Sequence, residues 1–186
     1  MHAPLVCASN GAHQTLDEKA YIALGSNIEP EQNILHAARA LKAIGPILAT
    51  SRVYRNSAFA PEPQADYLNA AVLLLTDRDP GDLQSKLRQI EADLGRVRSK
   101  NKYAPRTIDL DLCLYGSRTM EGETLTLPDP DIQSRPYLAV ILSELNPDYV
   151  LPTTGESLNS IALQLRETTH LMLEKDLSRR LAALMG

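Results

Sequence analysis

The sequence predicts an α+β protein in which an antiparallel sheet has helices on both faces. Short apolar or alternating segments, typical of strands, are interspersed with segments of helical periodicity. Their order along the chain is β-α-β-β-α-β. A length of 186 residues, of which 44% are hydrophobic and 23% charged, suits one domain of ordinary size with its own core.

The first half of the chain is expected to hold two strands with a helix between them. Residues 21 to 24 are apolar and predict a strand that ends at the turn-forming Gly25-Ser26-Asn27. Pro30 suits the first turn of a helix, and apolar residues then recur at helical spacing up to Gly45. Residues 47 to 54, rich in small and β-branched side chains, predict the second strand.

A third strand, Tyr67–Thr76, precedes the most clearly delimited helix. Asp79 stands at its N-cap position, Pro80 opens it, and Gly95 follows its last apolar residue. From residue 107 to 115 apolar residues fall at every second position, which is typical of a half-buried strand. The resulting order is that of the ferredoxin-like split βαβ arrangement.

Further helices are expected after the last of these strands. Apolar residues between 138 and 145 predict a third helix on the other face of the sheet, and two amphipathic stretches follow between 157 and 184, interrupted near Thr168. We therefore expect three parts: a flexible tail at 1–18, a main domain at 19–153 and a C-terminal helical extension at 154–186.

The apolar face of the extension allows two interpretations. It carries four leucines: Leu171, Leu177, Leu181 and Leu184. Either this face packs on the main domain, or it forms a contact with a second copy of the chain. The sequence is thus compatible with a monomer or a weak dimer.

Composition excludes several classes of function. A net charge of −4 argues against a general nucleic-acid binder, and no stretch approaches the roughly 18 apolar residues of a membrane helix. The N-terminus lacks the basic start and apolar stretch of a secretion signal. Two cysteines, Cys7 and Cys113, cannot form a disulfide framework, so both are expected to be free thiols in the cytoplasm.

One segment reverses the overall charge. Residues 86 to 106 hold seven basic and two acidic side chains. A solvated helix end and loop is one explanation, and a binding site for a small polyanionic ligand is the other.

A pair of carboxylates follows this basic segment. Asp109 and Asp111 are two apart on a predicted strand, so they face the same way with Cα atoms about 6.5 Å apart. Such a pair is either a solvated polar strand face or a site for Mg²⁺ that also binds phosphate oxygens. Arg96, Arg98 and Arg106 lie nearby in sequence. Carboxylates and guanidinium groups together favour phosphoryl transfer, and side chains must hold the phosphates because no glycine-rich phosphate loop is present.

A second cluster suits a flat heterocycle. Tyr67 and Asn69 share one face of a predicted strand, and Tyr137 begins the third helix. Two aromatic rings with an amide between them can stack on a ring and bind its edge, although buried tyrosines are also common in cores. Phe59 lies in a proline-containing loop that could close over such a site.

Four segments together resemble the signature of a known family. They are YIALGSN at 21–27, DYLNAAV at 66–72, GRVR at 95–98 and PRTIDLD at 105–111. In order and spacing they are similar to the 6-hydroxymethyl-7,8-dihydropterin pyrophosphokinase family, over residues 21 to about 152. The resemblance implies a ferredoxin-like α+β fold and transfer of a diphosphoryl group from ATP to the pterin hydroxymethyl oxygen, releasing AMP, in folate biosynthesis.

The resemblance also implies roles for individual residues. Asp109 and Asp111 would hold two Mg²⁺ ions and, with Arg96 and Arg106, form the catalytic group. The expected ATP-binding residues are Arg98, Lys102, Tyr103, Leu112, Thr126, Asp129 and Arg135. The expected pterin-binding residues are Asn56, Phe59, Tyr67, Asn69 and Tyr137. Asn27 and Glu91 match positions that support the site.

The chain departs from the family pattern after Leu127-Pro128. The family usually has histidine there, and this chain has Asp129, whose negative charge should weaken ATP binding. Two alternatives to an active enzyme of this family follow. One is a relative that binds pterin or nucleotide with little or no turnover, and the other is a diphosphokinase that acts on a related pterin.

Overall fold

The computed structural model describes residues 17–58, 60–99, 101, 103–166 and 169–185. Expectations for the tail up to residue 16, and for Cys7, Phe59, Lys102 and Thr168, therefore concern residues outside the described part. Glu18 was expected in the tail, but it begins the first strand, opposite Thr76.

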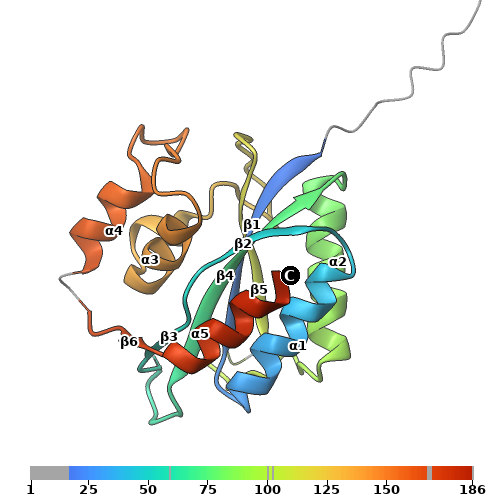
Figure 1. Cartoon of the computed structure of the whole chain (residues 1–186), viewed down its shortest axis with the longest axis vertical. Helices are drawn as coiled ribbons and strands as arrows, with labels where there is room; N and C mark the ends of the chain where they lie inside the picture. The colour runs from blue at the N-terminus through green and yellow to red at the C-terminus, as the bar shows by residue number, and fades with distance from the viewer. Residues whose placement is uncertain (1–16, 59, 100, 102, 167–168, 186) are drawn as a thin grey trace, which may run out of the picture.

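One antiparallel sheet forms the centre of the molecule (Figure 1). Its strands are β1 (Glu18–Ser26), β2 (Ile47–Thr50), β3 (Tyr54–Asn56), β4 (Tyr67–Thr76), β5 (Asp109–Tyr115) and β6 (Met172–Leu173). The order is β5-β1-β4-β3-β6, and β2 also pairs with β4. Strand β1 thus lies between β4 and β5, and β2 and β3 both pair with the other edge of β4. When β2 and β3 are counted as one divided strand, this is the ferredoxin-like arrangement, which confirms the expected fold.

Helices cover both faces of the sheet. They are α1 (Pro30–Lys42), α2 (Pro80–Asp93), α3 (Pro136–Leu145), α4 (Leu158–Arg166) and α5 (Lys175–Ala182). Helices α1, α2 and α5 lie on one face, and α3 with α4 on the other (Figure 1). Two short 3-10 segments, Pro130–Gln133 and Ala183–Met185, complete the described elements. Within the described residues, no helix has the length and apolar character needed to cross a membrane.

The predicted strand over residues 47 to 54 is wrong in one respect, because it is divided into β2 and β3. Between them, two backbone amides donate to side chains instead of to a neighbouring strand. The amide of Arg52 donates to Glu144 at 2.8 Å, and that of Val53 donates to the hydroxyl of Ser178 at 2.8 Å. These partners are far away in sequence, so residue type within the strand could not predict the break.

The C-terminal helices pack against their own chain. Leu177 and Leu181 are 3% and 0% exposed in the core beneath α1 and α2. Leu171 and Leu184 are partly buried against the two core clusters. This favours packing over an intermolecular role for the four leucines. The short strand β6, which was not expected, adds a further attachment to the sheet through β3.

Alternation along the strands decides which side chains meet. Ile22 and Leu24 of β1 point to the α1 and α2 face, whereas Tyr21 and Ala23 point to the α3 face. The same alternation in β4 and β5 directs the residues with odd numbers at one end of the sheet toward α3. That end is not filled by apolar side chains, and the polar residues of three strands gather there.

Candidate active site

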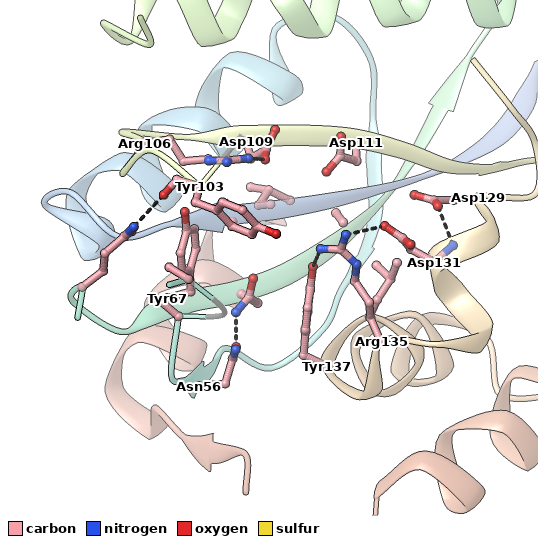
Figure 2. Close-up of a pocket in the computed structure, with 18 residues that line it drawn as sticks. Asn56, Tyr67, Tyr103, Arg106, Asp109, Asp111, Asp129, Asp131, Arg135 and Tyr137 are labelled. Carbon is pink, nitrogen blue, oxygen red and sulfur yellow. Dashed lines mark hydrogen bonds and ion pairs between the residues drawn. The ribbon is translucent and has the colours of Figure 1, made fainter. Parts of the chain in front are cut away.

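A cavity of about 340 Å³ opens at this end of the sheet, between the strands and the start of α3 (Figure 2). Its polar lining residues are Asn56, Gln64, Tyr67, Asn69, Tyr103, Arg106, Asp109, Asp111, Asp129, Asp131, Arg135 and Tyr137. Three loops, four strands and one helix contribute to it, so segments far apart in sequence line one space.

The floor of the cavity follows from the register of three neighbouring strands. Gly25 of β1 pairs with Asn69 on β4 and with Asp109 on β5. Two residues away on β1, Ala23 pairs with Asp111 of β5. The centre of the floor therefore carries no large side chain, and an amide lies on one side of it and two carboxylates on the other.

Two arginines bind the two oxygens of Asp109 separately. Arg96 donates to Oδ1 and Arg106 donates to Oδ2. Arg96 also pairs with Glu91, which is 1% exposed and accepts the backbone amide of Leu110 on β5 at 2.8 Å. The buried glutamate thus orients an arginine and, through Leu110, the strand that carries the aspartates.

The two aspartates differ in their electrostatic surroundings. Withdrawal from water acts to raise the pKa of Asp109, but the charges of Arg96 and Arg106 and their hydrogen bonds outweigh it, so this pKa lies below its usual range. Withdrawal from water raises the pKa of Asp111 to about 7, and the negative charges of Asp109 and Asp129 add to the effect. The ionised form of Asp111 is therefore unfavourable unless a cation lies beside it.

This arrangement fits Mg²⁺ that is bound together with a phosphorylated ligand. Among the described residues, no group of three or more histidine, cysteine, aspartate or glutamate side chains is placed to hold a metal ion. Mg²⁺ commonly binds through one or two carboxylates and takes its other ligands from substrate phosphates and water. Asp109 and Asp111 can supply such a pair, and their like charges are unfavourable without a cation.

The opposite half of the cavity is aromatic and amide-lined. Tyr67 and Tyr137 both project into it (Figure 2), and withdrawal from water raises the pKa of Tyr137 to about 12. Between the strands, Nδ2 of Asn69 donates to Oδ1 of Asn56 at 2.5 Å. This bond orients two amides whose remaining polar atoms can contact the edge of a flat ring.

Arg135 lies where the aromatic half meets a second group of aspartates. Its guanidinium pairs with Asp131 at 2.8 Å and donates to the hydroxyl of Tyr137 at 3.4 Å. Asp129 caps the short 3-10 segment, because its Oδ1 accepts the amide of Asp131 at 2.9 Å. Burial is the main cause that raises the pKa of Asp129. The residue that replaces the usual histidine therefore has a structural contact of its own.

Most of the predicted site residues meet at the cavity. The exceptions within the described residues are Arg96, Arg98, Leu112 and Thr126. Arg96 reaches the site through Asp109, and Arg98 is exposed but binds Glu91 at 2.5 Å. Thr126 lines a neighbouring cavity of about 390 Å³, which Asp129 also lines.

The side chain of Leu112, an expected nucleotide-binding residue, does not line the cavity. It is 4% exposed in the core beneath α1 and α2, on the opposite face of β5 from Asp111. Alternation along a strand places adjacent residues on opposite faces, so Asp111 and Leu112 cannot both project into one cavity.

Sequence reasoning missed Gln64 and Asp131. Gln64 donates from Nε2 to the backbone oxygen of Tyr103 at 2.6 Å, and Nδ2 of Asn27 donates to Gln64 at 3.3 Å, so this amide joins three loops. Nothing in the spacing around Gln64 signals that role. For Asp131 a signal was present, because an arginine follows it four residues later.

Comparisons with known proteins show the family to which the chain belongs. A sequence model of 7,8-dihydro-6-hydroxymethylpterin-pyrophosphokinase (HPPK) matches residues 21–147. The 2-amino-4-hydroxy-6-hydroxymethyldihydropteridine pyrophosphokinase of Synechocystis is 41% identical over 142 residues, which cover 75% of this chain and 72% of that relative. The protein of the same name from Haemophilus influenzae is 40% identical over 140 residues, which cover 73% of this chain and 86% of the relative.

The fold is also found among solved structures. Plasmodium falciparum HPPK-DHPS A437G with STZ-DHP has a TM-score of 0.65 at 13% identity, over 84% of this chain and 48% of that one. This chain thus corresponds to about half of that protein, and the likeness concerns the fold alone. The match of the sequence model over most of the chain, and the two relatives, establish the family. The chain belongs to the 7,8-dihydro-6-hydroxymethylpterin-pyrophosphokinase family.

Proposed function

We propose that this chain transfers the terminal diphosphoryl group of ATP to the hydroxymethyl oxygen of 6-hydroxymethyl-7,8-dihydropterin, as a step of folate synthesis. One observation carries the proposal: a single cavity joins a half lined by tyrosines and amides to a half lined by arginines and aspartates. The first half suits a flat heterocycle and the second suits a polyphosphate.

The pterin would bind between Tyr67 and Tyr137, with its edge toward the Asn56–Asn69 pair. Stacking between two rings fixes the plane of a flat ligand, and hydrogen bonds to amides fix its rotation within that plane. The hydroxymethyl group would then point toward Asp109, because Gly25 separates Asn69 from Asp109 without a side chain.

The triphosphate would lie over the arginine and aspartate half. Asp109 and Asp111 would hold the two Mg²⁺ ions, which, when bound, neutralise phosphate charge. Arg106 lines the cavity, and both Arg96 and Arg106 donate to Asp109, so the two guanidinium groups would lie near the phosphates and stabilise the charge that develops there. Arg135, Tyr103, Thr126, Asp129, Arg98 and Lys102 are assigned to the nucleotide.

The reaction forms one bond and breaks one. The pterin hydroxyl oxygen attacks the β-phosphorus of ATP, the bond from that phosphorus to the oxygen bridging it to the α-phosphorus breaks, and the hydroxyl proton is released to water. The products are AMP and the pterin diphosphate. The chain's contribution is positioning and charge stabilisation, because phosphoryl transfer needs little covalent chemistry from the protein.

We further infer that the chain works on these two small molecules as a monomer in the cytoplasm. Support for the monomer comes from Leu177 and Leu181, which are buried within their own chain. Sedimentation at micromolar concentration tests it, and a dimer under those conditions contradicts it.

The identity of the nucleotide product tests the proposed reaction. The protein is mixed with ATP, Mg²⁺ and 6-hydroxymethyl-7,8-dihydropterin, and nucleotides are separated by chromatography. AMP that appears only with the pterin supports diphosphoryl transfer. ADP, or no pterin-dependent product, contradicts it. In the second case, pterin binding measured by calorimetry separates a binding protein from a protein that uses another acceptor.

A further inference from the structure

The C-terminal segment forms a clamp on the outer edge of the sheet. We call residues 172–178 the clamp: they comprise β6 and the first turn of α5. Strand β6 pairs with Tyr54 and Arg55 of β3. The clamp lies beyond residue 147, where the match to the family's sequence model ends. Figure 1 shows it beside β3, far along the chain from the strand that it borders.

Three further contacts fasten the clamp to the start of β3. The amide of Glu174 donates to the backbone oxygen of Val53 at 2.9 Å, and the amide of Val53 donates to the hydroxyl of Ser178 at 2.8 Å. Nε of Arg55 donates to the carboxylate of Glu174 at 2.6 Å. Both backbone groups of Val53 are thus bound by the clamp.

On its other side, β3 borders the proposed pterin site directly. Tyr54 pairs with Asn69, and Asn56 pairs with Tyr67. The side chains of Asn56 and Asn69 are hydrogen-bonded at 2.5 Å. Strand β3 has only three residues, so β4 and the clamp together hold it from its two edges.

We propose that the clamp is a positioning element for pterin recognition, in which Glu174 and Ser178 act through β3 to hold Asn56 against Asn69. The inference rests on the proposed function only in naming the ligand. A strand of three residues with one neighbour has few hydrogen bonds to oppose fraying, and a second neighbour restricts its movement. The arginines and aspartates of the phosphate half belong to other elements, so we expect the clamp to affect pterin binding more than ATP binding.

The first experiment compares three variants of the full chain by steady-state kinetics. Glu174→Ala removes the contact with Arg55, and we expect the KM for the pterin to rise about three- to tenfold, with the KM for ATP and kcat within twofold of wild type. Glu174→Gln keeps an oxygen that can accept from Arg55, so we expect partial rescue. Asp176→Ala is the matched control, because the carboxylate of Asp176 pairs with Arg179 on the exposed side of α5 and not with β3 among the described residues.

A second control separates positioning from general loss of stability. Arg180→Ala removes the 3.2 Å pair between α5 and Glu31 of α1, but it leaves the contacts with β3 intact. If Arg180→Ala and Glu174→Ala lower the melting temperature equally and raise the pterin KM equally, the clamp acts only through stability and the inference is overturned. The inference requires that only Glu174→Ala raises the pterin KM.

The route through Asn56 is tested by a double-mutant cycle. If Glu174 acts through Asn56, the double variant that carries both Asn56→Ala and Glu174→Ala binds pterin about as weakly as the single variant Asn56→Ala. Additive losses contradict this route. Hydrogen exchange gives a readout that needs no ligand, because Glu174→Ala should speed exchange of the β3 amides relative to Asp176→Ala. If the wild-type protein forms no AMP, the proposed function is refuted. If Glu174→Ala leaves hydrogen exchange of the β3 amides unchanged, the positioning role of the clamp is refuted.

Discussion

Asn69 and Asp109 lie on opposite sides of one residue, because each is the strand partner of Gly25. A Cβ atom at Gly25 would lie 3.2 Å from Oδ1 of Asn69 and 3.9 Å from Cβ of Asp109. Across this glycine, the amide that would bind the pterin edge and the carboxylate that would bind metal are held in one row. The distance between the two halves of the site is therefore set by the sheet itself.

We expect Gly25→Ala to impair catalysis while leaving the fold intact. The added methyl group presses on the Asn69 amide, which must shift by a few tenths of an ångström, and on the floor beside Tyr67. We expect kcat/KM for the pterin to fall by about tenfold or more, because small misplacements are costly for a reaction that depends on positioning. Gly81→Ala is the control, since nothing lies within 4 Å of a Cβ at that helical position. Equal kinetics of the two variants would contradict the assigned role of Gly25.

The two aspartates should respond differently to loss of charge. Asp109→Asn leaves Arg96 and Arg106 without their shared carboxylate, so we expect about 2 to 3 kcal/mol of lost stability and loss of activity. Asp111→Asn removes a charge that its acidic neighbours oppose, so we expect unchanged or raised stability with activity lowered about 100-fold. Thermal unfolding in metal-free buffer measures the first difference and AMP formation the second. A destabilised Asp111→Asn variant would contradict this electrostatic account.

The periodicity of apolar residues correctly predicted the main strands and helices. The alternation in β5 and the proline and glycine at the ends of α2 reflect local backbone chemistry, and the structure agrees with both. Asp79 occupies the expected N-cap position, but its side chain makes no capping bond and pairs with Arg118 at 3.6 Å instead. The position followed from local sequence, whereas the partner depends on a loop that comes later in the chain.

The site was only partly predictable for the same reason. Asp109 and Asp111 could be paired from their spacing on one strand. The role of Gly25 depends on the register of three strands, and Gln64 acquires its role from contacts with two other loops. The side chain of Leu112 lies in the core instead of the cavity, because a family match identifies a position but not the face to which its side chain points.

A hydrogen bond on the α3 side of the sheet should make stability sensitive to alkaline pH. The hydroxyl of Tyr54 donates to Glu144 at 2.5 Å, and withdrawal from water, followed by this bond, raises the pKa of Tyr54 to about 12. The unfolded chain loses this proton near pH 10, so the stabilisation is complete below pH 10 and is lost between pH 10 and 12.

Tyr54→Phe tests this pH dependence. The variant should be less stable than wild type at pH 8, because the bond to Glu144 is absent, and its stability should fall less steeply between pH 10 and 12. Urea unfolding at several pH values measures both effects. Tyr115→Phe is a useful comparison, since Tyr115 donates to a backbone oxygen of Arg78 and not to a carboxylate. If the free energy of unfolding falls equally steeply with pH in wild type and Tyr54→Phe, the alkaline pH dependence does not come from Tyr54.

Asp129 offers a test of how the nucleotide is bound. Its carboxylate lies in the cavity with Asp111 and Asp131, so it adds negative charge where ATP phosphates are proposed to lie. Asp129→Asn removes this charge and retains an oxygen to accept the amide of Asp131, and we expect the KM for ATP to fall about three- to tenfold. Asp129→His should lower it as well, with the bond to the Asp131 amide lost. The pterin KM should stay constant, and exposed Asp148→Asn serves as the charge-matched control. If the KM for ATP is the same in all four proteins, Asp129 does not act on the phosphates through its charge.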